Sequence, residues 1–338
     1  TGFKGSWLSL WLYLRGAKVL GISDKIPTNP SHFKLLNLQK KIISKRIDIN
    51  NFNKLKKIFR EFKPDYVFHL AAQSIVKKSY SNPSITWKTN LLGTLNILEC
   101  LRLQENETIA IMVTSDKAYK NIEINKGYKE TDILSGSDPY GASKSSADIC
   151  INSYVKSYFS EKRNKVFIIT ARAGNVIGGG DWTEDRLIPD IVKSSNLKMP
   201  TIIRNLKATR PWQHVLDVLN GYLLAAYKLK KNKRLHGQAF NFGPSINKNL
   251  NVKAVLKISK KLWPKIKWKL QKNKNKYNEN TLLRLNSGKS KSILGWKSLL
   301  TFQETIKLTI SWYKKYYSKE KNFFKISSKQ IKNFQHKI

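Results

Sequence analysis

The sequence contains few cysteines and no long apolar run, and both shortages narrow its possible classes. Its 338 residues include two cysteines, Cys100 and Cys150. Both lie in apolar helical patterns, so we expect buried free thiols and no disulfide framework. No apolar stretch reaches the ~20 residues that span a bilayer, and no signal peptide with a small-residue cleavage site is recognisable. We therefore expect a cytoplasmic protein with no membrane partner.

Acidic residues are scarce relative to basic ones. The chain has 63 lysines and arginines against 22 acidic residues, a formal net charge of +41. Such a charge would serve nucleic-acid binding through many phosphate contacts. The excess is mostly lysine, however, and it is spread over the whole chain. Arginine, which reads phosphates and bases with a bidentate fork, is not enriched. We therefore expect a solvated lysine-rich surface and no nucleic-acid partner.

The apolar pattern indicates a globular α/β chain. Hydrophobic residues make up 41% of the sequence and aromatic residues 11%, enough for a sizeable core. Runs such as "YVFHLA", "IAIMVTS" and "VFIITA" alternate with helical patterns, which predicts a doubly wound parallel sheet covered on both faces. The expected strands are residues 18–22, 65–70, 108–114 and 165–171, and the expected helices are 5–15, 51–62, 84–102 and 140–159.

This regularity fades in the second half of the chain. Glycine-rich "GNVIGGGDW" and loop-like "NLKATRPWQH" interrupt it. Further strand and helix patterns follow in "QAFNFG", "NVKAVLKISKKLW", "IKWKL" and "TFQETIKLTISWYKKYY". Residues 319–338 are rich in lysine and predict a frayed basic tail.

The opening "TGFKGSWL" fits the second half of a phosphate-binding loop. Gly2 and Gly5 match the last two glycines of a G-x-x-G-x-x-G pattern, with Phe3 and Lys4 between them. Glycine lets a dinucleotide pyrophosphate approach the backbone, and a helix N-terminus supplies N–H donors. The first glycine and the first strand would precede Thr1, so we expect an N-terminal truncation. An ordinary helix start explains the same residues equally well.

Two later stretches fit the same dinucleotide-binding site. Asp48 follows a strand-like segment, where its carboxylate could bind an adenine amino group, although such a residue is more often the N-cap of the next helix. In "FHLAAQS", Leu70, Ala71 and Ala72 end a buried strand with small residues that permit close approach of a cofactor. His69 in this stretch is expected to be structural.

The stretch "VTSDKAY…DPYGASK" carries the most chemistry. Tyr140 and Lys144 stand four residues apart in a helical pattern and therefore share one face. A lysine ammonium beside a phenol favours the phenolate and lowers the phenol pKa, so Tyr140 is a candidate base for a hydroxyl proton. Ser115, at a strand end, could hydrogen-bond the same hydroxyl. Alone, Y-x-x-x-K usually marks surface residues; its order after the glycine loop favours the functional interpretation.

Together these motifs resemble the extended short-chain dehydrogenase/reductase superfamily and, within it, the nucleotide-sugar 4,6-dehydratases. The resemblance extends from Thr1 to about Trp312, and "GNVIGGGDW" with "RPWQHV" is its most specific part. The other motifs that carry it are "TGFKGSWL", "FHLAAQS", "TNLLGTLNILE", "VTSDKAY", "DPYGASK", "ARAGNVIGGGDW" and "DRLIPDI". The wider group usually has Thr-Asp-Glu at the strand end, whereas this chain has Ser115, Asp116 and Lys117, which resembles the branch that acts on CDP-glucose.

The resemblance implies a Rossmann-type α/β fold that binds NAD. It implies an NAD-binding domain over residues 1–175 and a smaller α/β domain over 176–318, mainly for substrate, with some segments returning to the first domain. The implied cofactor contacts are Gly2, Phe3, Lys4, Gly5, Asp48, Ile49, Leu70, Ala71, Ala72, Asn90, Tyr140 and Lys144. A homo-oligomer is also implied, with helices 84–102 and 140–159 paired across a two-fold axis; these helices could also simply cover the sheet.

The reaction that the resemblance implies is redox-neutral. Tyr140 takes the 4-hydroxyl proton while hydride leaves C-4, water is eliminated across C-5 and C-6, and hydride returns to C-6. Asp116 is the implied acid, with a pKa raised by burial, and Lys117 is the implied base at C-5. From the residues alone, an exposed ion pair at a strand end is the favoured interpretation of Asp116 and Lys117.

Binding a nucleoside diphosphate calls for arginine forks. Arg186 in "EDRLIP" and Arg210 in "TRPWQH" are the first candidates and Arg204 a weaker one, while Asn175 and Asp181 could contact sugar or phosphate-side hydroxyls. Trp182 and Trp212 are expected to pack in the core, and Arg172 could equally be a buried structural residue. No metal site is expected.

Three alternatives remain open at this stage. A dehydratase for another nucleotide, or a nucleotide-sugar 4-epimerase, shares most motifs, but a plain epimerase has no use for the Asp116–Lys117 pair. A non-catalytic nucleic-acid-binding protein would use the charge alone. A chain that truly begins at Thr1 would be an inactive fragment with poor stability and weak NAD binding.

Overall fold

The computed structural model describes residues 1–161, 163–244, 250–271 and 282–338. Its main sheet has four parallel strands in the order β3 (Tyr66–His69), β4 (Thr108–Val113), β5 (Val166–Ala173) and β9 (Ala239–Phe242). A separate parallel pair joins β1 (Leu20–Ser23) to β2 (Ile43–Arg46). Within the described residues, β1 and β3 are not hydrogen-bonded to each other. The expected α/β fold with parallel strands is confirmed, and the four predicted strands match β1, β3, β4 and β5 within two residues.

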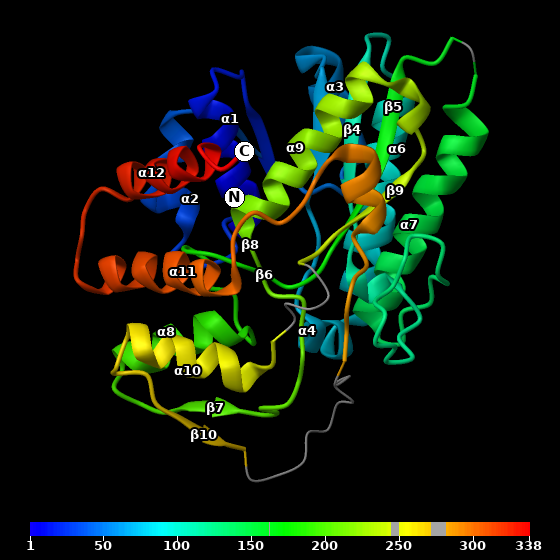
Figure 1. Ribbon diagram of the computed structural model, residues 1–338. Coiled ribbons are helices and arrows are strands. Elements are labelled where there is room, and N and C mark those ends of the chain that lie inside the picture. Colours follow the sequence, from blue (N-terminus) through cyan, green and yellow to red (C-terminus); the bar gives the residue numbers. More distant parts are fainter. Residues whose placement is uncertain (162, 245–249, 272–281) are drawn as a thin grey trace.

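Helices cover both faces of the main sheet because its strands are apolar on both sides. In β4, Ile109, Ile111 and Val113 face one core cluster, while Ala110 and Met112 face the other. The first cluster packs under α1 (Phe3–Leu14) and α9 (Val215–Lys231), and the second under α3 (Phe52–Phe62), α6 (Gly93–Arg102) and α7 (Pro139–Tyr158) (Figure 1). This two-sided burial is the signature of a parallel sheet with helical crossovers.

The helix predicted over residues 84–102 is divided. It begins as α5 (Pro83–Trp87), passes through one π-helical stretch at Lys88–Leu92 and continues as α6. Gly93 directly follows this π-helical stretch, and a Cβ added there would lie 2.3 Å from Cδ1 of Ile49. Glycine at this position therefore permits close packing of the helix on the chain after β2, which periodicity alone does not reveal.

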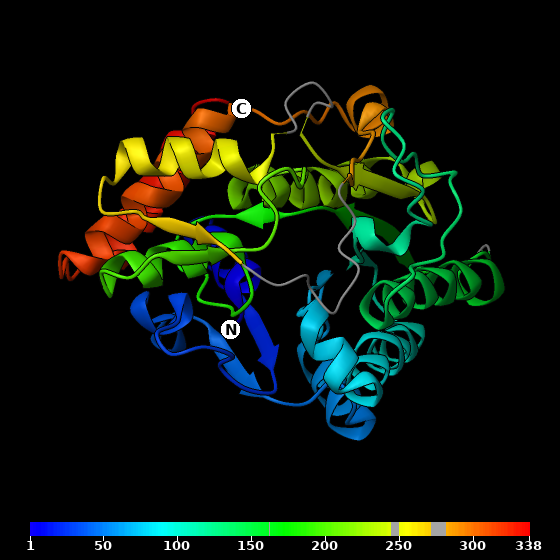
Figure 2. The same cartoon turned by 90° about the horizontal axis from the view of Figure 1, so that it is seen from below.

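The C-terminal half contributes to both parts of the molecule. The pairs β6 (Val176–Ile177) with β8 (Gln213–His214) and β7 (Thr201–Ile203) with β10 (Trp268–Leu270) lie beside α8 (Leu187–Asn196), α10 (Val252–Leu262) and α11 (Phe302–Tyr317). These elements form the layer at the upper left of Figure 2. Meanwhile α9 and β9 return to the main sheet. Short helices complete the described chain at α2 (His32–Leu35), Leu38–Lys40, α4 (Val76–Ser81), Asp116–Ala118, Lys233–Leu235 and Ser290–Leu294.

The prediction of a frayed tail over residues 319–338 is wrong. Residues Phe323–Gln335 form α12, whose N-cap Asn322 accepts a hydrogen bond from the backbone N–H of Lys325. Phe323, Ile331 and Phe334 are buried, and the Phe334 ring packs edge-on against Trp11 of α1. α12 therefore packs against α1 at the other end of the chain. The lysines that suggested a tail occupy the outer face of an amphipathic helix.

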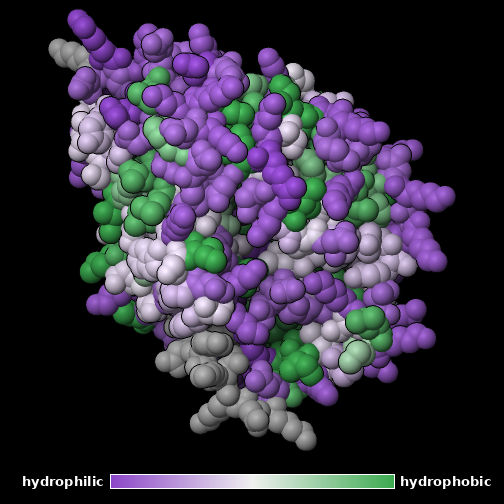
Figure 3. Space-filling view, turned by 180° about the vertical axis from the view of Figure 1, so that it is seen from behind, coloured by the Kyte–Doolittle hydropathy of each residue, from purple (hydrophilic) through white to green (hydrophobic). Residues whose placement is uncertain are grey.

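Polar side chains cover most of the surface. The face in Figure 3 is largely hydrophilic, with small scattered apolar patches. Cys100 is buried and Cys150 half-buried, and both are free thiols as expected. Burial raises the pKa of Cys100 to about 12, so this thiol is unreactive. In the described part of the chain, no helix is both long and apolar enough to cross a bilayer.

Candidate active site

One large cavity of about 2330 Å³ lies at the ends of strands β1, β3, β4 and β5 and extends toward the C-terminal layer. We call it the site cavity. It is the place where ligands bind in open α/β sheets, outside the carboxyl ends of the strands. Nineteen of the twenty residues assigned to the site in the sequence line it, and these are Gly2, Phe3, Lys4, Gly5, Asp48, Ile49, Leu70, Ala71, Ala72, Ser115, Asp116, Lys117, Tyr140, Lys144, Asn175, Asp181, Arg186, Arg204 and Arg210.

The N-terminus of α1 opens directly into the site cavity. Gly2 is the N-cap, so it has no side chain to occupy the first backbone N–H groups. A Cβ added at Gly2 or Gly5 would meet no described atom within 4 Å. Free N–H donors, the positive end of the helix dipole and this open space together fit a pyrophosphate group.

Asp48 and Ile49 line the neighbouring wall. Asp48 is exposed, and its Oδ1 accepts hydrogen bonds from the backbone N–H and side-chain amide of Asn50 at 2.8 and 2.9 Å. The N-cap of α3 is Asn51, so the capping role considered for Asp48 is not what the structure shows. With its carboxylate at the rim of the cavity, Asp48 is placed to accept from an amino or hydroxyl group of a dinucleotide.

The end of β4 turns sharply and presents a serine, a carboxylate and a lysine. Ser115 is the N-cap of the single 3₁₀ turn Asp116–Ala118, and its hydroxyl accepts from the backbone N–H of Lys117 at 3.2 Å. The same hydroxyl donates to Oδ1 of Asp116 at 3.0 Å. The other oxygen of Asp116, Oδ2, is buried with no hydrogen-bond partner among the described residues. A buried carboxyl oxygen left unpaired at a cavity wall is a candidate for reaction chemistry.

Burial is the largest influence on the pKa of Asp116. Its side chain is 4% exposed. Loss of hydration raises the pKa of Asp116, while its hydrogen bond with Ser115 and the charges of Lys117 and Arg210 oppose that rise. The interpretation of Asp116 as a solvent-exposed ion-pair member is therefore wrong, because the residue is buried, and its raised pKa makes the carboxyl a candidate proton donor.

Tyr140 and Lys144 lie on one face of α7, as their spacing predicts. The Lys144 amine is buried and donates to the carbonyl of Val113 at 3.3 Å. Burial, followed by the charge of Lys4, lowers the pKa of Lys144 to about 7. Burial also raises the pKa of Tyr140, and its hydrogen bond with the Ser115 hydroxyl only partly opposes this. The phenol pKa is thus not lowered as we expected, because desolvation outweighs the charges around it.

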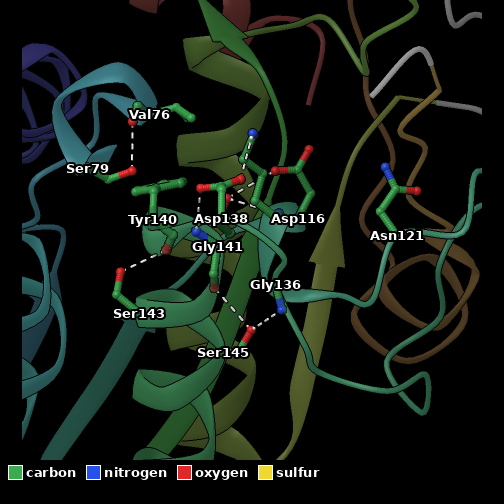
Figure 4. A network of polar contacts seen from close by, with 12 residues as sticks. Val76, Ser79, Asp116, Asn121, Gly136, Asp138, Tyr140, Gly141, Ser143 and Ser145 are labelled. Carbon is green, nitrogen blue, oxygen red and sulfur yellow. Dashed lines mark hydrogen bonds and ion pairs between the residues drawn. The ribbon is translucent and has the colours of Figure 1, made fainter. Parts of the chain in front are cut away.

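Asp138, which the sequence analysis missed, lies at the start of α7. Its Oδ1 caps the helix by accepting from the backbone N–H of Gly141 at 2.9 Å, and its Oδ2 lies 3.3 Å from Nζ of Lys117. Figure 4 shows Asp138 between Tyr140 and Asp116. The N-cap position before Pro139 was readable in "SDPYG", but the second contact depends on the fold bringing residue 117 to this helix.

Asn90 occupies a different place from that expected. It is fully buried and is not among the described residues that line the site cavity. Its amide accepts from the backbone N–H of Gln73 at 2.8 Å, donates to the carbonyl of Gln73 at 3.0 Å and donates to the Ser143 hydroxyl at 2.9 Å. Asn90 therefore joins the loop after β3 to α7 from behind the cavity wall.

Arg186 and Asp181 form an ion pair at the wall of the site cavity. Arg186 donates to Oδ2 of Asp181 and to the Ser74 hydroxyl, each at 2.9 Å. Oδ1 of Asp181 accepts from the backbone N–H of Thr183 at 3.0 Å, and Tyr313 donates to the Asp181 carbonyl. Asp181 thus orients the guanidinium, and Ser74, which the sequence did not suggest, ties it to the loop after β3.

Other predicted residues divide between the cavity and the core. Arg204 and Arg210 line the cavity. Trp182 and Trp212 are both buried, as expected for packing residues, although each has an edge on the cavity. Arg172 is structural: it makes a buried bidentate pair with Asp148, at 2.8 and 2.7 Å. Its place at the edge of a second, smaller cavity behind the sheet separates it from the site cavity.

Two further questions raised by the sequence are the role of His69 and the presence of a metal site. His69 is 5% exposed and its ring nitrogen lies 3.0 Å from the Thr94 hydroxyl, which is the structural role expected of it. In the described ranges, no three His, Cys, Asp or Glu residues gather in a way that could hold a metal ion.

Comparison with known proteins agrees with this geometry. The family described as GDP-mannose 4,6 dehydratase matches residues 1–309. A CDP-glucose 4,6-dehydratase of Salmonella typhimurium strain LT2 is 39% identical over 317 residues, covering 93% of this chain and 88% of that protein. A dTDP-glucose 4,6-dehydratase of Haemophilus influenzae is 25% identical and covers 93% and 95% of the two chains.

Solved structures share the fold. The UDP-glucose 4-epimerase of Thermotoga maritima, determined with UDP-glucose, superposes with a TM-score of 0.81 at 24% identity and covers 93% of this chain and 96% of that one. The UDP-glucose 4-epimerase of Thermus thermophilus, in complex with NAD, gives a TM-score of 0.79 at 24% identity, with 93% and 96% covered.

A parallel Rossmann-type sheet with a tyrosine and a lysine one helical turn apart at its strand ends defines a short-chain dehydrogenase/reductase. Within that class, the chain belongs to the GDP-mannose 4,6-dehydratase family of nucleotide-sugar enzymes.

Proposed function

We propose that this protein is an NAD-dependent lyase that converts CDP-glucose to CDP-4-dehydro-6-deoxyglucose and water. The observation that carries the proposal is the convergence of Asp116, Lys117 and Tyr140 on one cavity, into which the free N-terminus of α1 also opens. The relative from Salmonella typhimurium, which is named for this activity, supports the choice of nucleotide.

The cavity fits NAD as the cofactor. The Gly2–Gly5 turn would hold the pyrophosphate, Asp48 and Ile49 would contact the adenosine end, and Ala71 and Ala72 would allow close approach of the dinucleotide. When bound, NAD supplies the hydride acceptor and later the hydride donor, so the overall reaction needs no external oxidant.

The first proton step belongs to Tyr140. Its hydroxyl lines the cavity and interacts with Ser115, so one sugar hydroxyl placed between them would be held by both. Tyr140 accepts the 4-hydroxyl proton as hydride leaves C-4. Burial raises the Tyr140 pKa, and the charge of Arg186 opposes that rise. Lys144, one turn along the same helix, would add to the stabilisation of the phenolate when it is protonated.

The second and third proton steps belong to Lys117 and Asp116. The 4-ketone acidifies the C-5 proton, which the neutral amine of Lys117 removes. The C–H electron pair forms the C-5/C-6 double bond while the 6-hydroxyl departs, protonated by Asp116, as water. Asp116 suits this role because burial raises its pKa and its Oδ2 has no hydrogen-bond partner among the described residues.

Arginines that line the site cavity would anchor the nucleoside diphosphate. Arg186 is held by Asp181 and Ser74 with its guanidinium at the cavity wall, so it is pre-organised to bind an anion. Arg204, Arg210 and Asn175 line the same cavity. We assign sugar and phosphate recognition to this group.

The proposal extends to the location of the enzyme in the cell. A nucleotide sugar is a cytoplasmic metabolite, so we place the enzyme in the cytoplasm.

The proposal also extends to the oligomeric state. The apolar side chains Ile85, Leu92, Ile149 and Tyr158 are exposed on α5, α7 and the π-helical stretch between α5 and α6. They suit the pairing of these helices with a second copy of the chain, so we expect a homo-oligomer.

A substrate comparison tests the function. The protein is incubated with NAD and either CDP-glucose or dTDP-glucose, and the products are separated and weighed by mass spectrometry. We expect a product lighter than CDP-glucose by one water and bearing a 4-ketone, formed much faster than from dTDP-glucose. A product with unchanged mass and inverted C-4 would instead identify a 4-epimerase.

A further inference from the structure

Asp138 makes two contacts that have different consequences. Oδ1 caps α7, and Oδ2 lies 3.3 Å from the Lys117 amine. The Asp138 side chain is 14% exposed and that of Lys117 32% exposed, so the pair is only partly screened by solvent. The cap serves the helix, whereas the second contact serves only the amine.

The junction between the 3₁₀ turn and α7 does not depend on this ion pair. The Ser145 hydroxyl donates to the carbonyl of Ala118 at 2.7 Å and accepts from the backbone N–H of Gly136 at 2.9 Å. A Cβ at Gly141 would lie 2.7 Å from the carbonyl oxygen of Lys117, so the two backbones touch there. The backbone position of residue 117 is therefore fixed by other contacts, and the carboxylate acts on its side chain.

We infer that Asp138 is a positioning residue that holds the Lys117 amine on the Tyr140 side of the cavity through their 3.3 Å contact. This inference rests on the proposed function, in which Lys117 removes the C-5 proton. Removing the carboxylate takes away both the partner that fixes the amine and the negative charge beside it.

Other charged and titratable groups line the same cavity. They are Lys4 of α1, Asp116 next to Lys117 in the chain, Tyr140 and Lys144 of α7, Arg186 before α8 and Arg210 before β8. Asp138, which precedes α7, is the carboxylate whose Oδ2 lies 3.3 Å from the Lys117 amine.

Asp138→Asn separates the two contacts. Asparagine is as good an N-cap as aspartate, so α7 and the melting temperature should be preserved, while the negative charge beside the Lys117 amine is removed. Asp132→Asn is the matched control: Asp132 caps a nearby turn through the backbone N–H of Lys129 at 2.8 Å, and the variant removes the same charge. Both variants are compared with wild type.

The deciding measurement is the reactivity of the Lys117 amine, which does not require turnover. Trace labelling with acetic anhydride at a series of pH values, read by mass spectrometry of the peptide containing Lys117, reports the fraction of neutral amine. We expect the labelling curve of Asp138→Asn to move to lower pH by about 0.5–1 unit, the effect of a partly exposed ion pair. Asp132→Asn should match wild type.

Turnover supplies the second readout. The rising limb of the dehydration rate against pH should move with the labelling curve. Its plateau should fall by roughly 10-fold, because the amine is no longer held in place. An unmoved labelling curve in Asp138→Asn overturns the inference even if CDP-glucose is dehydrated. A moved curve in a protein that leaves CDP-glucose unchanged supports the positioning role while refuting the proposed function.

Discussion

The Ser115 hydroxyl donates to one carboxyl oxygen of Asp116 at 3.0 Å and leaves the other buried and unpartnered among the described residues. This relationship orients a desolvated carboxyl at the wall of the site cavity. It gives Asp116 the character of a proton donor, and it allows the same serine to interact with Tyr140. The oxidation and elimination steps therefore meet at a single strand end.

Asp116→Asn should uncouple the two steps. Asparagine keeps the shape and the hydrogen bond to Ser115 but cannot donate a proton to the 6-hydroxyl, so we expect dehydration to fall by about 10²–10⁴-fold. Oxidation at C-4 should persist, seen as reduced cofactor in a single turnover. Full loss of cofactor reduction, with NAD binding intact, would contradict this assignment.

The pH profile should carry the signature of the same carboxyl. Because burial raises the pKa of Asp116, its protonated form persists above the usual range of an aspartate, and dehydration should decline as pH rises through that raised value. In Asp116→Asn, the residual rate should lack this falling limb. The test is the pH dependence of kcat in both proteins. A limb that survives the substitution must belong to another group.

Tyr140→Phe should stop the reaction before any hydride moves. The phenyl ring fills the same space but cannot accept the 4-hydroxyl proton, so cofactor reduction should fall by about 10²–10⁴-fold while NAD still binds. Stopped-flow absorbance of the reduced cofactor measures this directly. Tyr119→Phe is a suitable control, because Tyr119 is buried next to Arg172 and Asn241 and is not among the described residues lining the cavity. Equal loss in both variants would point to structural damage.

Arg186→Lys should weaken substrate binding more than chemistry. The guanidinium donates to both Asp181 and Ser74, and a lysine cannot reproduce this fork at the cavity wall. We expect KM for the nucleotide sugar to rise by roughly 10-fold with a smaller change in kcat. Arg102→Lys, in an exposed pair with Glu99 on α6, is the matched control and should leave KM unchanged. The opposite pattern, a lowered kcat at constant KM, would place Arg186 in the reaction step.

Phe334→Ala tests the packing of α12. Phe334 is 2% exposed and its ring contacts Trp11 of α1, the helix that opens the cofactor end of the cavity. Removing a buried phenyl group should lower the free energy of unfolding by about 3–5 kcal/mol, measured by denaturant titration. Lys332→Ala, on the outer face of the same helix, should change stability by less than about 0.5 kcal/mol. Equal stability of both variants would mean that α12 is a loosely attached tail after all.

The parts of the site that depend on local order were predictable from the sequence. A glycine loop opening a helix, a serine and carboxylate at a strand end, and a tyrosine and lysine one turn apart each occupy a few consecutive residues, and all of them line the cavity. The strand ends meet because parallel strands place their carboxyl ends at one edge, so β3, β4 and β5 bring distant residues together by topology alone.

What sequence reasoning missed depends on tertiary contacts. The Asp138–Lys117 pair joins residues 21 apart, and Ser74 meets Arg186 across 112 residues. Asn90 is assigned to the cofactor site by the family resemblance alone, whereas in the structure its amide bonds to the backbone of Gln73 and to Ser143. The predicted lowering of the Tyr140 pKa is wrong because the spacing of residues does not reveal how deeply a side chain is buried. Helix α12 is not predicted because its many lysines outnumber the apolar residues that pack it against the core.

The most direct test of the account follows one hydrogen. CDP-glucose carrying deuterium at C-4 is incubated with the protein and NAD in ordinary water, and the product is examined by NMR. The account predicts that the deuterium is found at C-6 of the 4-keto-6-deoxy product, because the hydride taken from C-4 is returned there within one active site, while C-5 carries a solvent proton. Deuterium retained at C-4, or lost to solvent without appearing at C-6, would contradict it.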